Sequence, residues 1–520
     1  MHASQELVTA TWILVSIYMV VILFLVIRGA LRIKNMSDYA VGNVSFSPVA
    51  VGLSLAASMT SAATFIINPG FVALYGVSGF ISLAIVLPLA AMVSLYFLTK
   101  GFRKQGTAVK ALTMAQWIGN RYQNKNYALF FAFLSLLLIT FIVLICVGLT
   151  AILSKALNVD SLYVLIAIVT FVFGYMMFGG ANSMVYTNLI QACIMIVVAI
   201  VLLGSGYEHF SNGIKGFLDK LAAIDPALAS TTNTKSPLFR DFFEIIVCQI
   251  IVGVAIVCQP HIITKSLLLK NAKDVNKYLL VGIVVELLFF LVVIAGLYAR
   301  LRFPDLTLNG KPMPMDTIMS TYVIQEFPVY VGLLVVMGLI SAGLSTLEGL
   351  IQALSTTITS DIVKPLVGKQ LFKGEEKSTT GLISEVWFNR LVIIVLAVVS
   401  TIISYQQIVS PNLSVGILAQ NGVYAYFSAA FVPVLLGTFG RNIPLIAPVV
   451  ASITAVVVHF GIYYGRLTPY MQEPVRNPGV ASALAILSSV VVSFILLALL
   501  KNRQDSATIK QTKAEVVDNY

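Results

Sequence analysis

Residues 341–361 read Ser-Ala-Gly-Leu-Ser-Thr-Leu-Glu-Gly-Leu-Ile-Gln-Ala-Leu-Ser-Thr-Thr-Ile-Thr-Ser-Asp, a hydroxyl-rich run inside an otherwise apolar segment. On a helix, Ala342, Ser345 and Thr346 share one face, because residues three and four apart are neighbours. Hydroxyl oxygens at membrane depth can hold a small hard cation, which must exchange its water shell for oxygen ligands. Ser and Thr in membrane helices also bond back to the preceding turn or join neighbouring helices, so this stretch alone leaves both interpretations open.

The whole chain is more apolar than a typical soluble protein. Of its 520 residues, 58% are hydrophobic and only 11% carry a charge, and apolar runs long enough to cross a membrane recur from end to end. The runs lack the alternating pattern of strands, which excludes a barrel. The sequence therefore predicts an all-α polytopic membrane protein with about thirteen transmembrane helices. The predicted spans are 7–29, 47–75, 78–100, 127–154, 161–178, 184–205, 241–262, 277–299, 328–360, 384–408, 413–437, 443–463 and 479–500.

The distribution of positive charges predicts how the spans are oriented. If the N-terminus lies outside and the spans alternate, most of the 33 Lys and Arg residues fall on the inner side, including Arg103, Lys104, Lys265 and Lys270. Cytoplasmic loops carry such an excess. We therefore expect a multi-pass protein of a cell membrane, specifically a bacterial inner membrane, with its C-terminus in the cytoplasm. Topology explains the net charge of +11, and no basic domain is present that would bind nucleic acid.

Residues that support enzyme chemistry are sparse. The four cysteines show no paired spacing, and the four histidines form no metal-binding pattern. No Walker loop and no GxSxG motif occurs. The longest outer loop, 209–240, and the tail, 501–520, are too short and too polar to bury a core of their own. We therefore expect no enzymatic activity.

Two prolines interrupt predicted spans at similar depths. Pro69, followed by Gly70, lies in the second span, and Pro260 lies in the seventh, five spans later. Transporters commonly carry discontinuous helices at corresponding positions of two inverted repeats, where opened backbone exposes polar groups near the midplane. A proline near a helix end can also simply terminate the helix, so each position alone leaves both interpretations open. Together the two positions favour a transport function.

A stretch of small and hydroxyl residues precedes Pro69, and several short motifs are distributed along the chain. They are Asp38-Tyr39 with Gly42, Ser61-Ala62-x-x-Phe65 with Pro69-Gly70, Gly179-Gly180 with Thr187 and Gln191, Gln259-Pro260-His261, Ser345-Thr346 with Asp361, and Phe427-Ser428-Ala429-Ala430-Phe431-x-Pro433 with Gly437. By these motifs, in this order, the sequence resembles the sodium/solute symporter family. Members of that family carry sugars, proline, pantothenate and monocarboxylates on a leucine-transporter-like core.

The resemblance implies a core of two inverted repeats of five helices each. The first repeat would comprise residues 38–208 and the second residues 241–437, with the outer loop 209–240 between them. An extra N-terminal span, 1–37, would precede this core. Two extra spans, 438–500, and the cytoplasmic tail, 501–520, would follow it.

The resemblance also implies a sodium site between the second and ninth predicted spans. Carried over residue by residue, its ligands are the backbone carbonyls of Ala57, Thr60 and Ala342 and the hydroxyls of Ser345 and Thr346. These oxygens carry no full negative charge. Such a site suits a monovalent ion and allows its release, whereas bidentate carboxylates would favour a divalent cation.

A second sodium position of the family carries an aspartate after the threonine of the Gly-Gly segment. In this chain Asn188 stands there. A carboxamide supplies one neutral oxygen and brings an NH₂ donor, which repels a cation. We therefore expect the second sodium site to be absent and one sodium ion to be carried in each cycle.

The identity of the solute is less well defined. The sugar-carrying branch has a Glu-Gln pair where Ala63 and Thr64 stand here, and proline carriers have an acidic residue in place of Met59. The Gln259-Pro260-His261 run and the pattern around Ser61 look closest to the pantothenate and monocarboxylate branch. We therefore expect a small organic acid, and an amino acid or a sugar stays open as an alternative.

Polar side chains at span depth are the candidate solute contacts. Opened-helix amides near Ser58 to Ser61 would receive a carboxylate, because the N-terminal end of a half-helix favours anions. Glu286 is the most informative candidate, because an ionisable group inside a span is costly and by default functional. It can act as a cation or proton relay, as a solute contact, or as a neutral acid bonded to a neighbouring helix. The full set is Ser58, Ser61, Thr140, Gln249, Glu286 and Gln420.

The function expected from these observations is sodium-coupled import of a small organic solute by alternating access. A proton-coupled carrier is an alternative, since Glu286 and His261 can relay protons. A membrane-embedded sensor with a transporter-like core is another, although its output domain would have to come from a separate protein. The expected partners are sodium ions, a small-molecule solute and the lipid bilayer, and the sequence does not define an oligomeric state.

Overall fold

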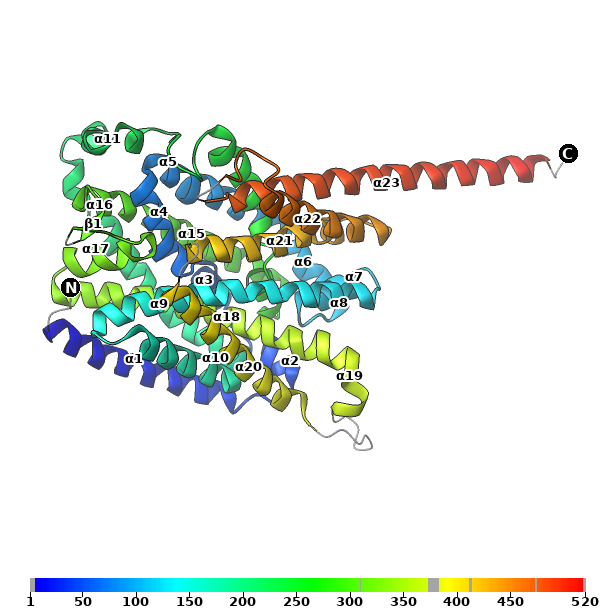
Figure 1. Cartoon of the computed structure of the whole chain (residues 1–520). Coiled ribbons are helices and arrows are strands. Elements are labelled where there is room, and N and C mark those ends of the chain that lie inside the picture. Colours follow the sequence, from blue (N-terminus) through cyan, green and yellow to red (C-terminus); the bar gives the residue numbers. More distant parts are fainter. Residues whose placement is uncertain (1–4, 309, 373–382, 411–413, 473–474, 518–520) are drawn as a thin grey trace.

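The computed structural model describes residues 5–308, 310–372, 383–410, 414–472 and 475–517 as a bundle of long helices that run side by side (Figure 1). Ten helices in these ranges are long and apolar enough to cross a membrane, or up to twelve if each of two bent helix pairs is one span. The all-α, multi-span class is confirmed, whereas the expected number of about thirteen spans is not reached. The ends of the predicted N-terminal segment and tail, 1–4 and 518–520, lie outside the described residues.

The first part of the chain consists of α-helices joined by short helical turns of tighter or wider winding, labelled η. In order, they are α1 (Gln5–Ala30), α2 (Met36–Val41), α3 (Pro48–Met59), η1 (Ala63–Ile67), α4 (Asn68–Tyr75), α5 (Val77–Phe80), η2 (Ile81–Val86), α6 (Leu87–Val109), α7 (Met114–Arg121), α8 (Lys125–Leu134), η3 (Ser135–Leu138), α9 (Ile139–Leu157), α10 (Ser161–Gly204), η4 (Tyr207–Phe210), α11 (Gly213–Ile224) and α12 (Pro226–Ala229).

The second part continues in the same way and adds one small hairpin. Its elements are η5 (Phe243–Cys248), α13 (Gln249–Ile256), α14 (Pro260–Ile263), η6 (Thr264–Leu268), η7 (Ala272–Asp274), α15 (Val275–Leu291), η8 (Val292–Ile294), α16 (Ala295–Arg302), β1 (Thr307–Leu308), β2 (Lys311–Pro312), η9 (Met315–Thr317), α17 (Ile318–Glu326), α18 (Val329–Thr357), η10 (Ile358–Val363), α19 (Lys364–Leu371), α20 (Glu385–Val409), α21 (Val415–Phe439), α22 (Ile446–Gly465) and α23 (Pro478–Val517). The strands β1 and β2 pair antiparallel, with Thr307 opposite Pro312.

The difference between twelve and thirteen spans lies in α10. A straight α-helix of its 44 residues would be about 66 Å long, roughly twice the thickness of the hydrocarbon core. The helix is interrupted at Gly180, which has φ 54° and ψ −163°. A Cβ at this position would lie 2.8 Å from the ring of Tyr39 and 2.9 Å from its carbonyl oxygen, so only glycine permits this approach of α2. The two predicted spans, 161–178 and 184–205, lie on either side of this interruption.

The two bent pairs contain the helix breaks. The axes of α3 and of the helix that follows it meet at 53°, and those on either side of the second break meet at 57°. Thr60 and Gln259 have extended backbone at these breaks. The second break directly precedes Pro260, as predicted. The prediction that Pro69 and Gly70 interrupt the second span is wrong, because Pro69 occupies the first turn of α4, where a missing N–H is tolerated.

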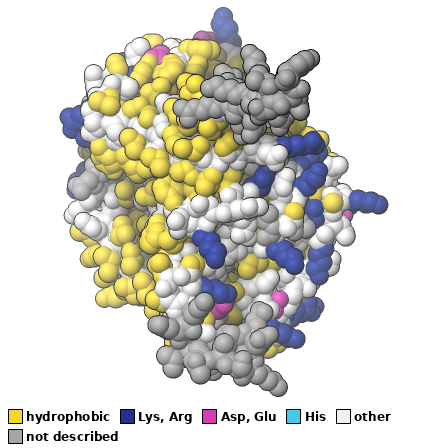
Figure 2. Space-filling view, turned by 90° about the vertical axis from the view of Figure 1, so that its right-hand side faces the viewer, with side chains coloured by type: hydrophobic (Ala, Val, Ile, Leu, Met, Phe, Trp, Pro, Cys, Tyr) yellow, Lys and Arg dark blue, Asp and Glu magenta, His cyan; other side chains and the backbone are white. Residues whose placement is uncertain are grey.

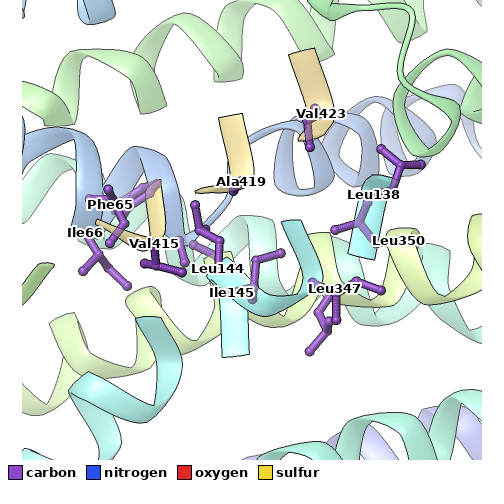
Figure 3. Packing of buried hydrophobic residues seen from close by; sticks show 14 of the residues in the cluster. Phe65, Ile66, Leu138, Leu144, Ile145, Leu347, Leu350, Val415, Ala419 and Val423 are labelled. Atoms are coloured by element: carbon purple, nitrogen blue, oxygen red, sulfur yellow. The ribbon is translucent and has the colours of Figure 1, made fainter. Parts of the chain in front are cut away.

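Apolar side chains from distant parts of the sequence fill the centre of the bundle. Figure 3 shows Phe65 of η1, Leu144 of α9, Leu347 of α18 and Val415 of α21 among the residues that converge there. By contrast, α1 and α20 expose many Ile, Leu and Val side chains along their length. In a membrane protein such surfaces face lipid, so α21 belongs to the interior and α1 and α20 to the rim.

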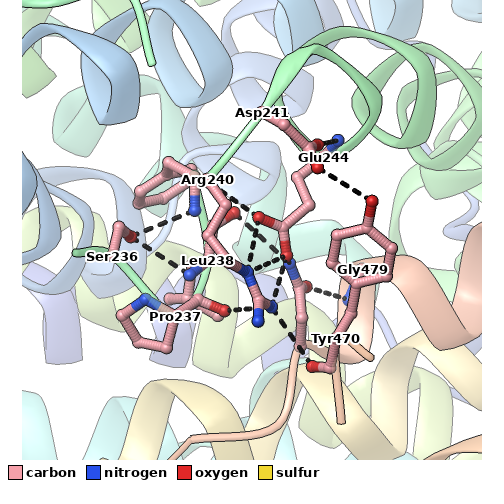
Figure 4. Close-up of polar contacts among 10 residues, drawn as sticks. Ser236, Pro237, Leu238, Arg240, Asp241, Glu244, Tyr470 and Gly479 are labelled. Atoms are coloured by element: carbon pink, nitrogen blue, oxygen red, sulfur yellow. Dashed lines mark hydrogen bonds and ion pairs between the residues drawn. The ribbon is translucent and has the colours of Figure 1, made fainter. Parts of the chain in front are cut away.

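A polar cluster joins the start of η5 to the loop between α22 and α23 (Figure 4). Arg240 and Glu244 form a forked ion pair, in which Nη2 lies 2.6 Å from Oε1 and Nε lies 3.0 Å from Oε2. Tyr470 donates its hydroxyl to Asp241 Oδ2 at 2.8 Å, and Asn477 donates to Glu244 Oε1 at 2.9 Å. Because charge-assisted, forked contacts have a defined geometry, the cluster holds the last two helices against the rest of the bundle.

Positive charges gather at one end of the bundle. Figure 2 looks onto the right-hand end of Figure 1 and shows Lys and Arg side chains spread over that end, with hydrophobic side chains along the flank. The helix α1 begins at the opposite end, and α23 extends beyond this one (Figure 1). The end shown in Figure 2 is therefore rich in positive charge and adjoins an apolar flank.

Candidate ion and solute site

The hydroxyl-rich stretch of α18 faces the opened end of α3. Ser345 Oγ donates to the carbonyl oxygen of Ala57 at 2.7 Å. Thr346 Oγ1 lies 3.1 Å from the carbonyl oxygen of Ser58 and 3.3 Å from that of Thr60. All five residues are fully buried. Side-chain and main-chain oxygens from two helices thus converge on one point inside the bundle.

Ala342 completes this oxygen cluster. Ser345 Oγ and Thr346 Oγ1 lie 3.1 Å and 3.4 Å from its carbonyl oxygen, which is the back-bonding geometry of hydroxyl residues in a helix. A hydroxyl that donates to a carbonyl still has lone pairs with which it can bind a cation. The structure therefore brings together the five residues that the sequence proposes as sodium ligands, Ala57, Thr60, Ala342, Ser345 and Thr346, and adds the carbonyl of Ser58.

The break in α3 explains why these carbonyls are available. The helix ends at Met59, and Thr60 has φ −91° and ψ 103°, so carbonyls of the last turn lose their partners within the helix. An unpaired carbonyl inside a membrane protein costs free energy unless another group or an ion satisfies it. The hydroxyls of Ser345 and Thr346 provide that partner from the neighbouring helix.

Glu286 of α15 lies behind the same break. Its Oε2 accepts a hydrogen bond from Thr60 Oγ1 at 2.8 Å, and its Oε1 has no hydrogen-bond partner among the described residues. The side chain is fully buried. This carboxyl group is therefore adjacent to a proposed sodium ligand, where it can contribute negative potential to a bound cation.

Glu348 is the centre of a second buried polar network. Its Oε2 accepts from Thr187 Oγ1 at 2.6 Å, and its Oε1 accepts from Tyr175 OH at 2.6 Å and from Gln191 Nε2 at 3.0 Å. The motif residues Thr187 and Gln191 thus donate hydrogen bonds to a carboxylate from another helix, that of Glu348. Asn188, at the position where we expect no second sodium, lies between this network and α3.

A cavity of about 90 Å³ lies between the two helix breaks. Met59 and Ser61 of the first break and Gln259 and His261 of the second contribute to its wall. Gln259 Oε1 and His261 Nδ1 are buried and have no hydrogen-bond partner among the described residues. A mostly apolar cavity with a few unpaired polar groups is the usual form of a small-molecule site.

Two of the six side chains predicted to contact the solute, Ser61 and Gln420, line this cavity. Thr140 instead donates to a carbonyl of its own helical segment, that of Leu137, at 2.8 Å. Depth in the membrane can be inferred from hydropathy, but the direction in which a helix turns each side chain cannot. The four that lie outside the wall of the cavity are Ser58, Thr140, Gln249 and Glu286.

Sequence reasoning missed two features of this region. It gave Gln259 and His261 no place in a solute site, although their position at a proline-containing break was a signal. It also counted Lys265 among the cations at the inner surface, and this is wrong, because Lys265 is only 3% exposed. The residue lies four positions after His261, so the two belong to the same side of the helical segment that follows the break.

Three cavities follow one another from the breaks toward the positively charged end. A space of about 30 Å³ shares His261 with the solute cavity and also touches Lys265. It shares Leu112 and Leu268 with a vestibule of about 790 Å³. Arg103, Lys110, Lys270 and Lys364 line that vestibule.

The segment η9 packs against η1 and α4, which follow the first helix break. Asp316 accepts hydrogen bonds from Ser414 Oγ at 2.9 Å and from the backbone N–H of Val415 at 3.2 Å, which caps the N-terminus of α21. Burial raises the pKa of Asp316 above its ordinary value. Next to it, the carbonyl of Met315 packs against Gly70, where a Cβ would lie only 2.6 Å away.

Most of the chain is similar to known proteins. A sodium/pantothenate symporter of Haemophilus influenzae is 27% identical over 333 residues, which are 63% of this chain and 66% of that protein, just under two thirds of its length. A sodium/proline symporter of Staphylococcus aureus is 26% identical over 444 residues, or 84% of this chain and 82% of that protein. Among solved structures, a Na⁺-coupled sialic acid symporter has the same fold, with a TM-score of 0.71 at 17% identity over 94% of this chain and 98% of its own.

The family comparison covers the segment that contains both helix breaks and the oxygen cluster. A model described as "Sodium:solute symporter family" matches residues 39–441. That segment begins at Tyr39, which packs against Gly180, and ends after Gly437 of the last motif. The chain therefore belongs to the sodium:solute symporter family.

Proposed function

We propose that this protein is a sodium-coupled symporter that imports a small organic solute by alternating access and has no enzymatic activity. The observation that carries the proposal is the meeting of the Ser345 and Thr346 hydroxyls with the carbonyls of the opened α3, beside a cavity between two helix breaks. Buried oxygens without a full charge suit a monovalent ion. Sodium bound there ties α3 to α18 and orders Ser61, which belongs to both the break and the cavity wall.

A small organic acid is the solute that we propose. The described part of the cavity wall contains no Asp, Glu, Lys or Arg, so a carboxylate would be received by backbone amides near Ser61, by the side chain of Gln259 and by the potential of the bound sodium. The relatives named for pantothenate support an acid, and those named for proline make an amino acid the next candidate.

Coupling between the two ligands follows from their shared element. Sodium and solute both require the break after Met59 in one conformation, so the binding of either lowers the cost of binding the other. Typical coupling free energies of about 1–3 kcal/mol correspond to affinity changes of about 5–150-fold. We expect sodium to lower the apparent dissociation constant of the solute within that range.

We also propose an orientation and a division of the chain. The end that carries the Lys and Arg side chains would face the cytoplasm, with the N-terminus outside and the C-terminus inside. The breaks at Thr60 and Gln259 would occupy equivalent places in inverted repeats 38–208 and 241–437. The spans in 1–37 and 438–500 would flank this core in a bacterial inner membrane.

A proton-coupled carrier is the second candidate, because the carboxyl group of Glu286 contacts Thr60 at the break and His261 lies between two of the cavities. Both groups can carry a proton. In that case the oxygen cluster would be a purely structural contact between α3 and α18.

Uptake into proteoliposomes with choline in place of sodium, at fixed pH, separates the two candidates. A panel of labelled small acids, amino acids and sugars is supplied with and without an inward sodium gradient. Sodium coupling predicts that one class of solute accumulates only with the sodium gradient. Accumulation that persists in choline and follows an imposed pH gradient would instead establish proton coupling.

A further inference from the structure

Lys265 carries an ammonium group into the interior of the bundle. It belongs to η6, immediately after the second helix break, and is only 3% exposed. Its Nζ donates to Ser54 Oγ of α3 at 2.8 Å. Asn188 Oδ1 lies 3.0 Å from the same nitrogen when its amide is oriented to satisfy its neighbours. Lys265 forms no ion pair with the residues that the structure describes, so neutral oxygens alone surround this cation.

The orientation of the Asn188 amide is set by the groups on either side of it. With Oδ1 toward Lys265, its Nδ2 lies 2.8 Å from Gln191 Oε1 and 3.3 Å from Glu348 Oε2, and every polar atom then faces a complementary partner. The opposite orientation would direct the NH₂ group toward the hydroxyls of Ser54 and Ser58 and toward the ammonium group. Asn188 is therefore a dipole between a cation and a carboxylate.

Glu348 supplies the compensating negative charge. It is fully buried and both of its oxygens accept hydrogen bonds, from Thr187, Tyr175 and Gln191 and, in the orientation above, from Asn188. Such a set of donors stabilises the carboxylate form. The Asn188 amide lies between the two groups, with Oδ1 3.0 Å from Lys265 Nζ and Nδ2 3.3 Å from Glu348 Oε2. Because an uncompensated charge inside the bilayer is very costly, the two groups form one neutral unit, and neither can be removed alone without consequence.

This neutral unit adjoins the proposed sodium ligands. Ser58 Oγ lies 2.9 Å from the Asn188 amide and 3.2 Å from the carbonyl oxygen of Ser345, and the carbonyl of Ser58 accepts from Thr346. The oxygens around the ammonium group, from Ser54 and Asn188, are hard neutral ligands of the kind that also bind alkali cations. A free cation of similar charge would be held there if the ammonium group were absent.

We propose that Lys265 is a tethered cation that occupies a second cation position formed by Ser54 and Asn188, with Glu348 as its counter-charge. The carrier therefore binds one sodium ion, at the Ser345 and Thr346 cluster, and carries its second positive charge as part of the protein. This inference rests on the proposed function, because it assigns the number of ions that the carrier takes up. Lys265, rather than Asn188 alone, excludes the second sodium.

The test counts the sodium ions bound to purified protein by equilibrium binding of sodium-22. The wild type is expected to bind one ion per chain with a Hill coefficient near one. Lys265→Met leaves Glu348 without a counter-charge and frees the position that the ammonium group occupies. This variant is therefore expected to bind two sodium ions per chain. Lys265→Arg retains the cation and should bind one. Lys155→Met is the matched control. Neutral oxygens also contact Lys155, those of Ser320 and Thr321 at 3.1 Å, but this lysine is not paired through an amide with Glu348.

A charge-balanced double variant makes the test independent of general damage. Lys265→Met combined with Glu348→Gln removes both charges, so sodium binding should return to one ion per chain. Two ions bound to the wild type, or one ion bound to a folded Lys265→Met protein, would overturn the tethered-cation proposal. If Lys265→Met does not fold, Lys265→Gln takes its place as the uncharged variant that retains Glu348, with the same expected count of two ions per chain. Failure of the proposed function gives a different result, namely no saturable sodium-22 binding to the wild type at all.

Discussion

At the scale of single residues, the ion site depends on a small number of hydroxyls. Ser345 and Thr346 each contact the opened end of α3, and the other oxygens of the cluster belong to the backbone. A backbone carbonyl cannot be removed by substitution, whereas a hydroxyl can. These two side chains are therefore the positions at which the sodium site can be altered without changing the path of the chain.

Ser345→Ala and Thr346→Ala should each weaken sodium binding by about 5–150-fold, since loss of a buried polar partner typically costs about 1–3 kcal/mol. Displacement of sodium-22 from the purified protein measures this change. Ser355→Ala is the matched control. Ser355 lies on the same helix, and its Oγ is 3.4 Å from the carbonyl oxygen of Gln352, one turn earlier, rather than from the opened end of α3. Unchanged sodium affinity in both variants would exclude the site.

Glu286→Gln tests the role of the carboxyl group beside the break. Glutamine keeps an oxygen that can accept from Thr60, so we expect the variant to fold and to reach the membrane. Removal of the negative potential should raise the sodium concentration for half-maximal uptake and leave the solute constant at saturating sodium unchanged. The opposite pattern, with intact sodium affinity and lost solute affinity, would restore the solute contact predicted from the sequence.

Residue chemistry was predictable from the sequence only where a local pattern fixes a direction. Ser345 and Thr346 were found because positions three and four apart on a helix share a face with Ala342. Gln249 and Thr140, predicted as solute contacts, lie outside the wall of the cavity, because nothing local determines which neighbour a helix turns toward. Lys265 was misplaced for a related reason, since a lysine after an apolar run is usually exposed, and its burial depends on Ser54 and Asn188 from distant segments.

At the scale of elements, the helix breaks decide where polar backbone is exposed. The break before Pro260 was predictable because proline removes a hydrogen bond. The break after Met59 was implied only by the family resemblance, because it contains no proline and the nearby Pro69 fits within the first turn of α4. The break inside α10 depends on Gly180, and two adjacent glycines do not reveal which of them takes a positive φ.

Gly180→Ala should destabilise the protein through this element. Alanine would be strained at φ 54°, and its Cβ would lie 2.9 Å from the carbonyl oxygen of Tyr39. Left-handed backbone costs a non-glycine residue about 1–2 kcal/mol, and the contact adds to that cost. Thermal unfolding of the purified protein should show a lower midpoint than for Gly174→Ala, a helical glycine with nothing within 4 Å of the added Cβ. Equal midpoints would show that the interruption is not required.

Asp316, which caps the N-terminus of α21, should make the stability of the protein depend on pH. Because burial raises the pKa of Asp316 in the folded protein, the folded state binds the proton more tightly than the unfolded chain. The contribution of Asp316 to stability is therefore complete below the ordinary aspartate pKa and is lost as the pH rises through the raised value. Asp316→Asn stays neutral, so its midpoint relative to the wild type should increase with pH. A difference in midpoint between the variant and the wild type that stays the same at every pH would contradict this assignment.

At the scale of the whole molecule, one end of the bundle carries many Lys and Arg side chains. Cavities lead from the helix breaks to a vestibule whose wall includes four of the Lys and Arg residues. The composition of the chain predicts the apolar flank and the charged end, because both depend on sums over many residues. The arrangement of the helices around the breaks, in contrast, requires contacts between segments that are hundreds of residues apart, such as Ser345 with Ala57.

Paired flux measurements in proteoliposomes test the central claim of sodium-coupled transport most directly. Sodium-22 entry is measured with and without the solute identified by the uptake panel, and entry of that labelled solute is measured with and without sodium. The account predicts that each ligand accelerates the entry of the other in a fixed ratio, and that Ser345→Ala combined with Thr346→Ala abolishes both effects. Solute entry that is unchanged when choline replaces sodium, in the wild type, would contradict it.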